Sequence, residues 1–560
     1  MASTKAAQAG AKGGKVYSVM SRDEIEAMIA EGRKIMIVDQ HVLKVDPWLS
    51  YHPGGDKAIL HMIGRDATDE VTILHSQEAY DQMARYRIGR VEGRWENFIP
   101  PIQGGKFRTL AEMDVQGEDT DSAQDPDEST SSSSRAPSPV FDTNKDGVRQ
   151  RKKDSVEASV SKSAQPTDGM TFLDSLTREE ISLDLDKYPS LDEETQANII
   201  TKYRELHQRI KDEGLYQCSY WKYGIECCRY FALLGTMIVC LRYGWYLTSA
   251  LALGFLWHQL VFTAHDAGHM GITHNFHVDT VIGIIIADFI GGLSMGWWKR
   301  SHNVHHIVTN SPEHDPDIEH LPLFAISHRF FTSLRSTYYD HIMQYDAFAK
   351  VLMKVQAYTY YPILSLARFN LMRLSWDYLI MGRGPTKGPA AWHRWLELTG
   401  QVFFWYWYGY VVMYKTLPDN WTRFGFFMIS NVAASPLHMQ IVLSHFAMST
   451  ADLGPNESFP QKMLRTTMDV DCPPWLDFIH GGLQFQAIHH LYPRIPRHNL
   501  RQTQKLVMEF CREVGIPYAL YGFVDGNKQV IGTLAEVSRQ AAILAKCQET
   551  ITKSGDFHMH

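Results

Sequence analysis

The sequence predicts a multidomain protein, in which a small soluble α+β module precedes an all-α integral membrane domain with about four transmembrane helices. The chain has 560 residues, which is too many for one ordinary hydrophobic core. Its mean hydropathy of −0.25 resembles that of a soluble protein only because polar segments dilute several long apolar windows. The net charge of −7, without any stripe of Lys and Arg, argues against nucleic acid as a partner.

Shifts in composition along the chain predict six segments. Residues 1–14 are small and polar, and we expect a disordered tail there. Residues 15–101 contain short apolar runs broken by turn residues, as in a compact module. Residues 102–170 are rich in Ser, Asp and Pro and bury too little apolar surface to fold, so we expect a disordered linker. The remaining segments are an amphipathic pre-membrane segment (171–220), the membrane domain (221–525) and a C-terminal tail (526–560).

Four apolar windows are long enough to be considered as membrane spans. Residues 243–264 contain no Asp, Glu, Lys or Arg, and residues 221–241 are a weaker candidate because Glu226 and Arg229 interrupt their start. Residues 398–414 and 424–445 are again free of these charges, and the aromatic run "FFWYWYGY" is typical of a membrane interface. These windows predict two helical hairpins.

Histidines gather in three short stretches near these windows: "HDAGH", "HNVHH" and "QAIHH". Positions i, i+3 and i+4 of a helix share one face, so the second and third stretches present the same triangle, with Gln486 in place of the first histidine. Histidines that cap helices or lie on a solvated face are the alternative for any one stretch. Seven imidazoles exceed the needs of one four-coordinate zinc ion, so the pattern predicts two metal ions held by His265, His269, His302, His305, His306, His489 and His490.

The three stretches resemble the histidine boxes of membrane fatty-acyl and sphingolipid desaturases, and Gln486 resembles the first residue of the third box in the branch fused to cytochrome b5. The resemblance implies that these seven histidines are catalytic and hold a non-haem di-iron centre. It also implies one more ligand from the last membrane helix. We expect His445 in that role because it ends its segment, and His438, seven residues earlier, stays an alternative. Gln486 is a further candidate ligand, or holds a water or orients a neighbour.

The membrane topology follows from the requirement that all three boxes meet on one side. Residues 281–298, which carry Asp288, lie alone between the first and second boxes, so we expect them to dip into the membrane or lie along its surface. The two hairpins then place the N-terminal module, a di-iron cap and the C-terminal region on the same face. Seven cysteines without a C-x-x-C pair favour a reduced, cytosolic location for that face.

The N-terminal module resembles cytochrome b5 over residues 16–95, on the stretches "YHPGGDKAIL" and "GRDATDEVTILHS". The resemblance implies haem b bound between His52 and His75. Two axial histidines leave no position for oxygen, so such a haem transfers electrons. His41 and His61 are expected to be structural.

The surroundings of the second and third boxes, "GWWKRSHNVHHIVTNSPEHDPDIEHLP" and "DFIHGGLQFQAIHHLYPRIPRHNLR", resemble the sphingolipid Δ8-desaturases of fungi and plants. This resemblance implies ceramide and O2 as substrates, NADH-cytochrome b5 reductase as electron donor, and a multi-pass location among the lipids of the endoplasmic reticulum membrane. A front-end desaturase acting on phospholipid or acyl-CoA, a di-iron lipid hydroxylase and a non-catalytic membrane haem protein are the alternatives.

Side chains near the boxes have predicted supporting roles. Asp266, Asp315 and Asp317 are candidates to bond the imidazole nitrogens that do not bind metal, with solvated loop carboxylates as the alternative. Trp297 and Trp298 precede the second box and either line an acyl channel or belong to an interfacial belt.

Overall fold

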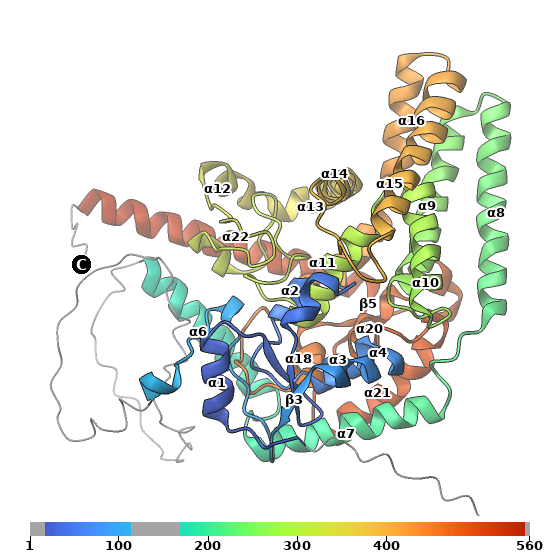
Figure 1. Cartoon of the computed structure of the whole chain (residues 1–560). Helices are drawn as coiled ribbons and strands as arrows, with labels where there is room; N and C mark the ends of the chain where they lie inside the picture. The colour runs from blue at the N-terminus through green and yellow to red at the C-terminus, as the bar shows by residue number, and fades with distance from the viewer. Residues whose placement is uncertain (1–16, 114–168, 555–560) are drawn as a thin grey trace, which may run out of the picture. The chain divides into compact units, whose positions relative to one another are not determined.

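The structure, a computed structural model, describes residues 17–113 and 169–554 (Figure 1). Contacts divide the chain into two compact units. The first comprises Met1–Trp48 and Met62–Ala123, and the second comprises Leu49–His61 and Gln124–His560. The expected tail at residues 1–14 and residues 114–168 of the expected linker lie outside the described residues.

The first unit is built around a three-stranded antiparallel sheet in the order β1-β2-β3. Ile35 pairs with Lys44 across the first two strands, and His41 pairs with Arg90 across the next two. Helix α1 begins at Ser21, whose side chain and that of Glu24 form a capping box. The small α+β module predicted from the sequence is confirmed. The elements are α1 (Arg22–Ala30), β1 (Ile35–Val38), β2 (His41–Lys44), η1 (Asp46–Tyr51), α3 (Thr68–Leu74), α4 (Gln77–Met83), η2 (Ala84–Tyr86), β3 (Arg87–Arg90) and η3 (Pro101–Gln103).

The second unit is mostly helical. Its segment Leu49–His61 carries the short helix α2 (Asp56–Leu60). Helices α6 (Gly169–Lys187) and α7 (Glu193–Asp212) precede the apolar region. Helix α7 is amphipathic, since Ile199, Tyr203, Leu206 and Ile210 are buried at helical spacing.

Three described helices are long and apolar enough to cross a membrane: α8 (Tyr220–Arg242), α9 (Tyr246–Gly268) and the stretch Asn420–Phe446, formed by α16 (Asn420–Val432) and α17 (Pro436–Phe446). Helix α9 contacts both α8 and α16, and Figure 1 shows the three running side by side. Only 11% of the apolar window of α8 is buried, so side chains such as Phe231 face outward, as on a lipid-facing helix.

The expected span at residues 398–414 is not one continuous α-helix. It lies on α15 (His393–Phe404) and the π-helix η6 (Trp405–Thr416), where the backbone widens from α to π geometry. Phe404 and Tyr408 from these elements are fully buried against Trp257 and Phe426 of the neighbouring helices. Phe404 and Tyr408 therefore belong to the core of the helical bundle, whereas Phe403, Tyr406 and Tyr410 of the same aromatic run are exposed.

Residues 276–308 form a sharply bent pair of helical segments. Helix α10 (Phe276–Ile284) and the π-helix η4 (Ile285–Ile290) are followed, after a short break, by α11 (Met295–Val308) at an angle of 118°. A bend of this size is typical of a broken membrane span or a re-entrant loop. Three candidates, or four if this pair is one span, agree with the predicted number of about four transmembrane helices. The set differs from the prediction, because residues 398–414 are not among the candidates and the bent pair was expected to dip into the membrane or lie along its surface.

The remaining elements form the cap of the second unit. A two-stranded parallel sheet joins β4 to β5, with Asp469 opposite Leu520. Residues 526–554, expected as a tail, form most of helix α22, whose apolar face is buried from Val530 to Leu544. The elements are η5 (His328–Thr332), α12 (Ala347–Met353), α13 (Gln356–Ser365), α14 (Ala367–Ile380), α18 (Phe459–Thr466), β4 (Asp469–Asp471), η7 (Pro474–Leu476), α19 (Asp477–His480), η8 (Leu483–Phe485), α20 (Gln486–Leu491), η9 (Arg497–Asn499), α21 (Leu500–Val514), β5 (Leu520–Gly522) and α22 (Phe523–Ser554).

Candidate metal centre

Helix α11 carries the second histidine stretch, and its start is fixed by buried side chains. Ser294 caps the helix by accepting from the backbone N–H of Trp297. A carboxylate oxygen of Asp288 accepts from Met295 N at 3.2 Å, and one of Glu397 accepts from Gly296 N at 3.0 Å. Carboxylates are favourable at a helix N-terminus, so these groups set where the helix begins and hence where its histidines lie.

The other histidines come from helix ends. His265 lies in the last turn of α9 and His269 at its C-cap, while His445 lies near the end of α17. The short helix α20 carries His489 and His490, and its backbone N–H at Ala487 donates to Asp469 at 2.8 Å.

These elements bring the histidines into two clusters. In the first cluster, one nitrogen from each of four histidines lies within 4.8 Å of the others: His265, His269, His302 and His489. In the second cluster the same holds for His305, His445 and His490. His306 lies between the clusters, with its Nε2 3.2 Å from that of His302 and its ring 4.3 Å from that of His490. The three sequence stretches therefore converge as predicted.

The chemistry of both clusters fits metal ions. Buried imidazole nitrogens of His269, His445, His489 and His490 have no hydrogen-bond partner among the described residues. Leaving such polar atoms buried and unpaired is costly, and a metal ion would satisfy them together. Burial lowers the pKa of His489 and of His490 well below the usual value, which favours the neutral imidazole that binds metal.

Carboxylates lie near the Nδ1 atoms of two histidines in the second stretch. Both oxygens of Asp315 lie about 3 Å from Nδ1 of His305, at 3.0 and 2.9 Å. An oxygen of Asp317 lies 3.6 Å from Nδ1 of His302. Burial alone would raise the pKa of Asp317, but His305 and His302 lower it below its usual value, so the carboxylate stays charged. The predicted supporting role fits Asp315 and Asp317.

The prediction for Asp266 was wrong. Its carboxylate is bonded by the hydroxyl of Tyr223 and the guanidinium of Arg497 rather than by an imidazole. Arg497 also pairs with Glu226 of α8. The position of Asp266 inside "HDAGH" turns its side chain away from the histidine face, toward α8 and η9.

His445 and His438 differ clearly in position. The ring of His445 lies 4.6 Å from that of His305 and 4.9 Å from that of His490. His438 belongs to neither cluster, although it is buried on the same helix. Gln486 is buried at the start of α20, on the same face as His489 and His490.

The two tryptophans before the box have different surroundings. Trp298 stacks on His302, with ring centroids 4.5 Å apart, and its edge approaches His265 and His269 at 5.4 Å each. Trp298 is therefore part of the wall of the first cluster. The indole Nε1 of Trp297 is buried without a hydrogen-bond partner among the described residues.

The candidate haem ligands each have an oriented ring. Nδ1 of His52 lies 2.6 Å from the carbonyl of Gly55, and Nδ1 of His75 lies 3.1 Å from the carbonyl of Val71. Donation from Nδ1 selects the tautomer whose Nε2 ligates iron. Burial also lowers the pKa of His52, which favours its neutral form. Both residues fit haem ligation.

Comparison with known proteins gives the family. A family model described as Fatty acid desaturase matches residues 243–522, and one described as Cytochrome b5-like Heme/Steroid binding domain matches residues 21–92. The chain belongs to the fatty acid desaturase family. It is 60% identical over 548 residues to a Delta 8-(E)-sphingolipid desaturase of Emericella nidulans, covering 97% of this chain and 98% of the relative.

Two further relatives differ in their named substrates. A Delta 8-(E)-sphingolipid desaturase of Kluyveromyces lactis is 48% identical, over 96% of both chains. An acyl-lipid (9-3)-desaturase of Borago officinalis is 34% identical, over 62% of this chain and 78% of the relative. The predicted resemblance to desaturases that carry a cytochrome b5 domain is confirmed.

We expect the Asp315→Asn variant of the desaturase to lose activity by about 10- to 100-fold, the range typical of a partner that orients a metal-binding histidine. The amide keeps the shape of the side chain but removes the charge that faces His305. Product formation and bound iron per chain are the measurements. Asp471→Asn, at an exposed carboxylate, is the matched control. Equal activity of the two variants would contradict the role of Asp315.

Arg497, just after the third box, was not predicted from the sequence: its buried guanidinium pairs with Asp266 and Glu226. The cluster of basic residues "PRIPRHNLR", beside an apolar region, is the sequence feature that could have indicated this buried arginine. We expect Arg497→Met to lower the stability of the desaturase by about 3–5 kcal/mol, because two buried carboxylates lose their partner. Thermal unfolding of the solubilised protein measures this, with the exposed Arg512→Met as control. An unchanged melting temperature would show that the network is not stabilising.

Proposed function

We propose that this desaturase introduces the Δ8 double bond into the long-chain base of ceramide, with O2 as oxidant and electrons supplied through its own haem domain. The observation that carries the proposal is the pair of buried histidine clusters at the ends of apolar helices. The identity of 60% over nearly the whole chain to a relative named for this reaction supports the choice of substrate.

The reaction needs a strong oxidant because a methylene in an alkyl chain has no neighbouring carbonyl to acidify it. Two iron ions, held by the first and second clusters together with His306, supply oxygen activation when bound. The stoichiometry balances as one CH2–CH2 unit, O2, two electrons and two protons giving CH=CH and two waters. The substrate supplies two of the four electrons that O2 takes up, and the haem domain delivers the other two.

The chain's own residues prepare the site for this chemistry. Asp315 holds His305 in one tautomer, and the ring of Trp298 keeps His302 in place and covers the first cluster. Buried surroundings keep His489 and His490 neutral. His445 is the additional ligand in this proposal, and Gln486 faces the same site from the start of α20.

The electron path and the location follow from the same proposal. His52 and His75 would hold haem b, which would supply electron transfer from NADH-cytochrome b5 reductase to the iron site. Fusion to the same chain raises the effective concentration of this donor. We place the haem domain at residues 15–101 and the desaturase domain at 221–525, with both facing the cytosol from the endoplasmic reticulum membrane.

Desaturation of an acyl lipid is the second candidate, because the Borago officinalis relative carries that name. The two candidates are separated by a competition experiment. The purified holoenzyme, in vesicles that contain equal amounts of ceramide and phosphatidylcholine, is supplied with NADH and cytochrome b5 reductase. We expect a new double bond in the long-chain base alone. A new double bond confined to the acyl chains of phosphatidylcholine would overturn the assignment to ceramide.

A further inference from the structure

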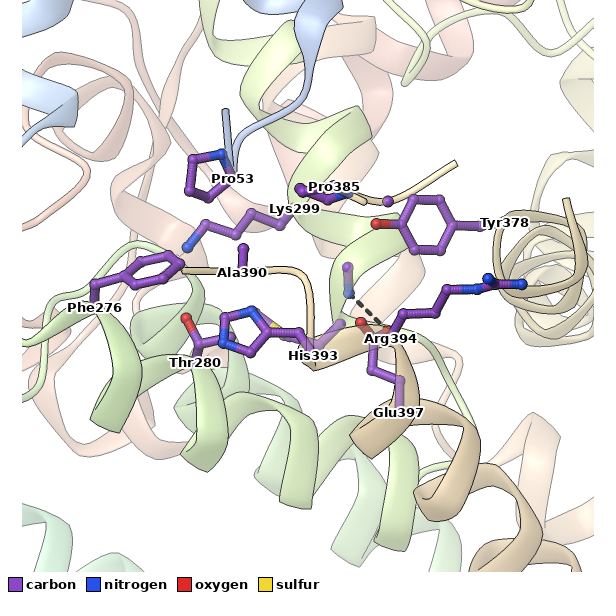
Figure 2. A pocket seen from close by; sticks show the side chains of 13 residues that line it. Pro53, Phe276, Thr280, Lys299, Tyr378, Pro385, Ala390, His393, Arg394 and Glu397 are labelled. Atoms are coloured by element: carbon purple, nitrogen blue, oxygen red, sulfur yellow. Dashed lines mark hydrogen bonds between the residues drawn. The ribbon is translucent and has the colours of Figure 1, made fainter. Parts of the chain in front are cut away.

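A pocket with a largely apolar lining and several polar side chains lies beside the second histidine stretch in the desaturase unit (Figure 2). Helices α10, α11, α14 and α15 contribute to its walls. Its polar side chains are Thr280, Lys299, Tyr378, His393, Arg394 and Glu397. None of these groups belongs to the histidine clusters, and of them only Glu397 also holds the start of α11.

Three of the polar side chains lack a hydrogen-bond partner among the described residues: Nζ of Lys299, Oγ1 of Thr280 and Nε2 of His393. Their exposed fractions are only 8%, 5% and 8%. Figure 2 shows these three side chains close together on one side of the pocket, with the ring of Phe276 beside the ammonium of Lys299. Buried polar groups are almost always paired, so three unpaired ones lining one pocket indicate a ligand with several polar atoms.

The charges of the pocket favour a neutral ligand. Lys299 makes no ion pair among the described residues, and its ammonium lies 5.2 Å from the centre of the Phe276 ring. Glu397 adds an acidic side chain to the same pocket, and its carboxyl group also accepts from Gly296 N. The guanidinium of Arg394 is directed to the carbonyl of Leu379, at 3.1 and 2.8 Å. A basic and an acidic side chain in one pocket suit hydroxyl and amide groups, which both donate and accept, better than a phosphate.

The pocket is next to the metal centre. Lys299 precedes His302 by three residues on α11, roughly one helical turn or about 5 Å. Met295, another lining residue, reaches the last turn of α9, since a Cβ placed on Gly268 would lie 2.6 Å from its Cε. Gly268 lies between His265 and His269, so a molecule in the pocket is separated from the first cluster by one layer of side chains.

We propose that this pocket binds the neutral polar head of the lipid substrate, its hydroxyl and amide groups, and thereby sets which carbon of the chain reaches the histidine clusters. The assignment rests on the proposed function. Lys299 donates to hydroxyl or carbonyl oxygens of the head, Thr280 exchanges a hydrogen bond with a hydroxyl, and Glu397 accepts from an N–H or O–H. The polar head then fixes the register of the alkyl chain along α11.

Two substitutions test the pocket. Lys299→Met keeps an unbranched chain of nearly the same length and removes the ammonium, and Thr280→Val is isosteric and removes only the hydroxyl. The full-length holoenzyme in lipid nanodiscs is titrated with a fluorescent short-chain ceramide. We expect binding to weaken about tenfold or more for Lys299→Met, and about threefold to tenfold for Thr280→Val. Lys528→Met, at an exposed lysine of α22, is the matched control and should bind as the wild type does.

The same variants are assayed for the position of the new double bond. Loss of the head contacts should spread the product over more than one position, whereas a purely structural defect would lower the yield without changing the position. Ceramide binding and product position unchanged in both variants, with wild-type content of haem and iron, would overturn the pocket assignment. Wild-type enzyme that forms no unsaturated long-chain base would instead overturn the proposed function.

Discussion

The His305→Ala variant is expected to form no detectable unsaturated lipid while its haem spectrum stays that of the wild type. His305 belongs to the second cluster, and its removal also takes the imidazole partner from the buried carboxylate of Asp315. Removal of a group that only orients a metal-binding histidine lowers activity by about 10- to 100-fold. Removal of the ligand itself should therefore lower activity by more than about 100-fold. Bound iron per chain should fall at the same time. Lipid mass spectrometry and metal analysis measure both effects.

His438→Ala is the matched control for this experiment, because His438 is a buried histidine of the same domain that lies in neither cluster. It should retain iron and most of the activity. Normal iron content and activity in His305→Ala would contradict the assignment of the second cluster. Equal losses of iron and activity in both variants would indicate a general effect of truncating a buried histidine.

Removal of a haem ligand should separate electron supply from the iron site. We expect His75→Ala to lose the spectrum of a bis-histidine haem and at least about 99% of the NADH-driven activity, because a haem without its second axial ligand is no longer an efficient electron carrier. Its content of non-haem iron should stay normal. Absorption spectroscopy, metal analysis and the rate of product formation are measured on the same preparation.

The control for the haem experiment is His41→Ala. His41 lies on strand β2, where Nδ1 contacts the carbonyl of Asp39 at 2.7 Å, and the sequence predicts only a structural role. Excess soluble cytochrome b5 should restore part of the activity of His75→Ala, since the iron site itself is intact. An unchanged haem spectrum in His75→Ala would exclude this residue as an axial ligand.

The histidines of the metal centre could be predicted because their spacing places their side chains on one face of a helix. In "HNVHH" and "QAIHH" the i, i+3 and i+4 positions of a helix place the side chains on one face, and both stretches are helical. His445 was predicted less directly, from its place at the end of an apolar segment, and lies in the second cluster.

Long-range partners could not be predicted in the same way. Asp266 lies inside the first histidine stretch, yet it pairs with Arg497, 231 residues later. The packing of α8, α9 and η9 decides which side chains meet across such a separation. No local pattern in the sequence predicts this packing. The pairing of Glu397 with the start of α11 was missed for the same reason.

The positions at which helices break could not be predicted from amino-acid composition either. Residues 398–414 are apolar and uncharged, but the change to π geometry at Trp405 divides them between α15 and η6. Helix α22 was expected as a tail because its sequence is polar overall, with apolar residues such as Val530 and Leu534 on one face only.

The central claim, that the histidine clusters desaturate a sphingolipid, is tested most directly in a yeast host that lacks this activity. Long-chain bases and fatty acids are analysed by mass spectrometry after expression of the wild-type chain or of His305→Ala. We predict a new double bond at the Δ8 position of the long-chain base with the wild-type chain and none with the variant. New unsaturation in the fatty acids alone, or the same long-chain bases from both chains, would contradict the account.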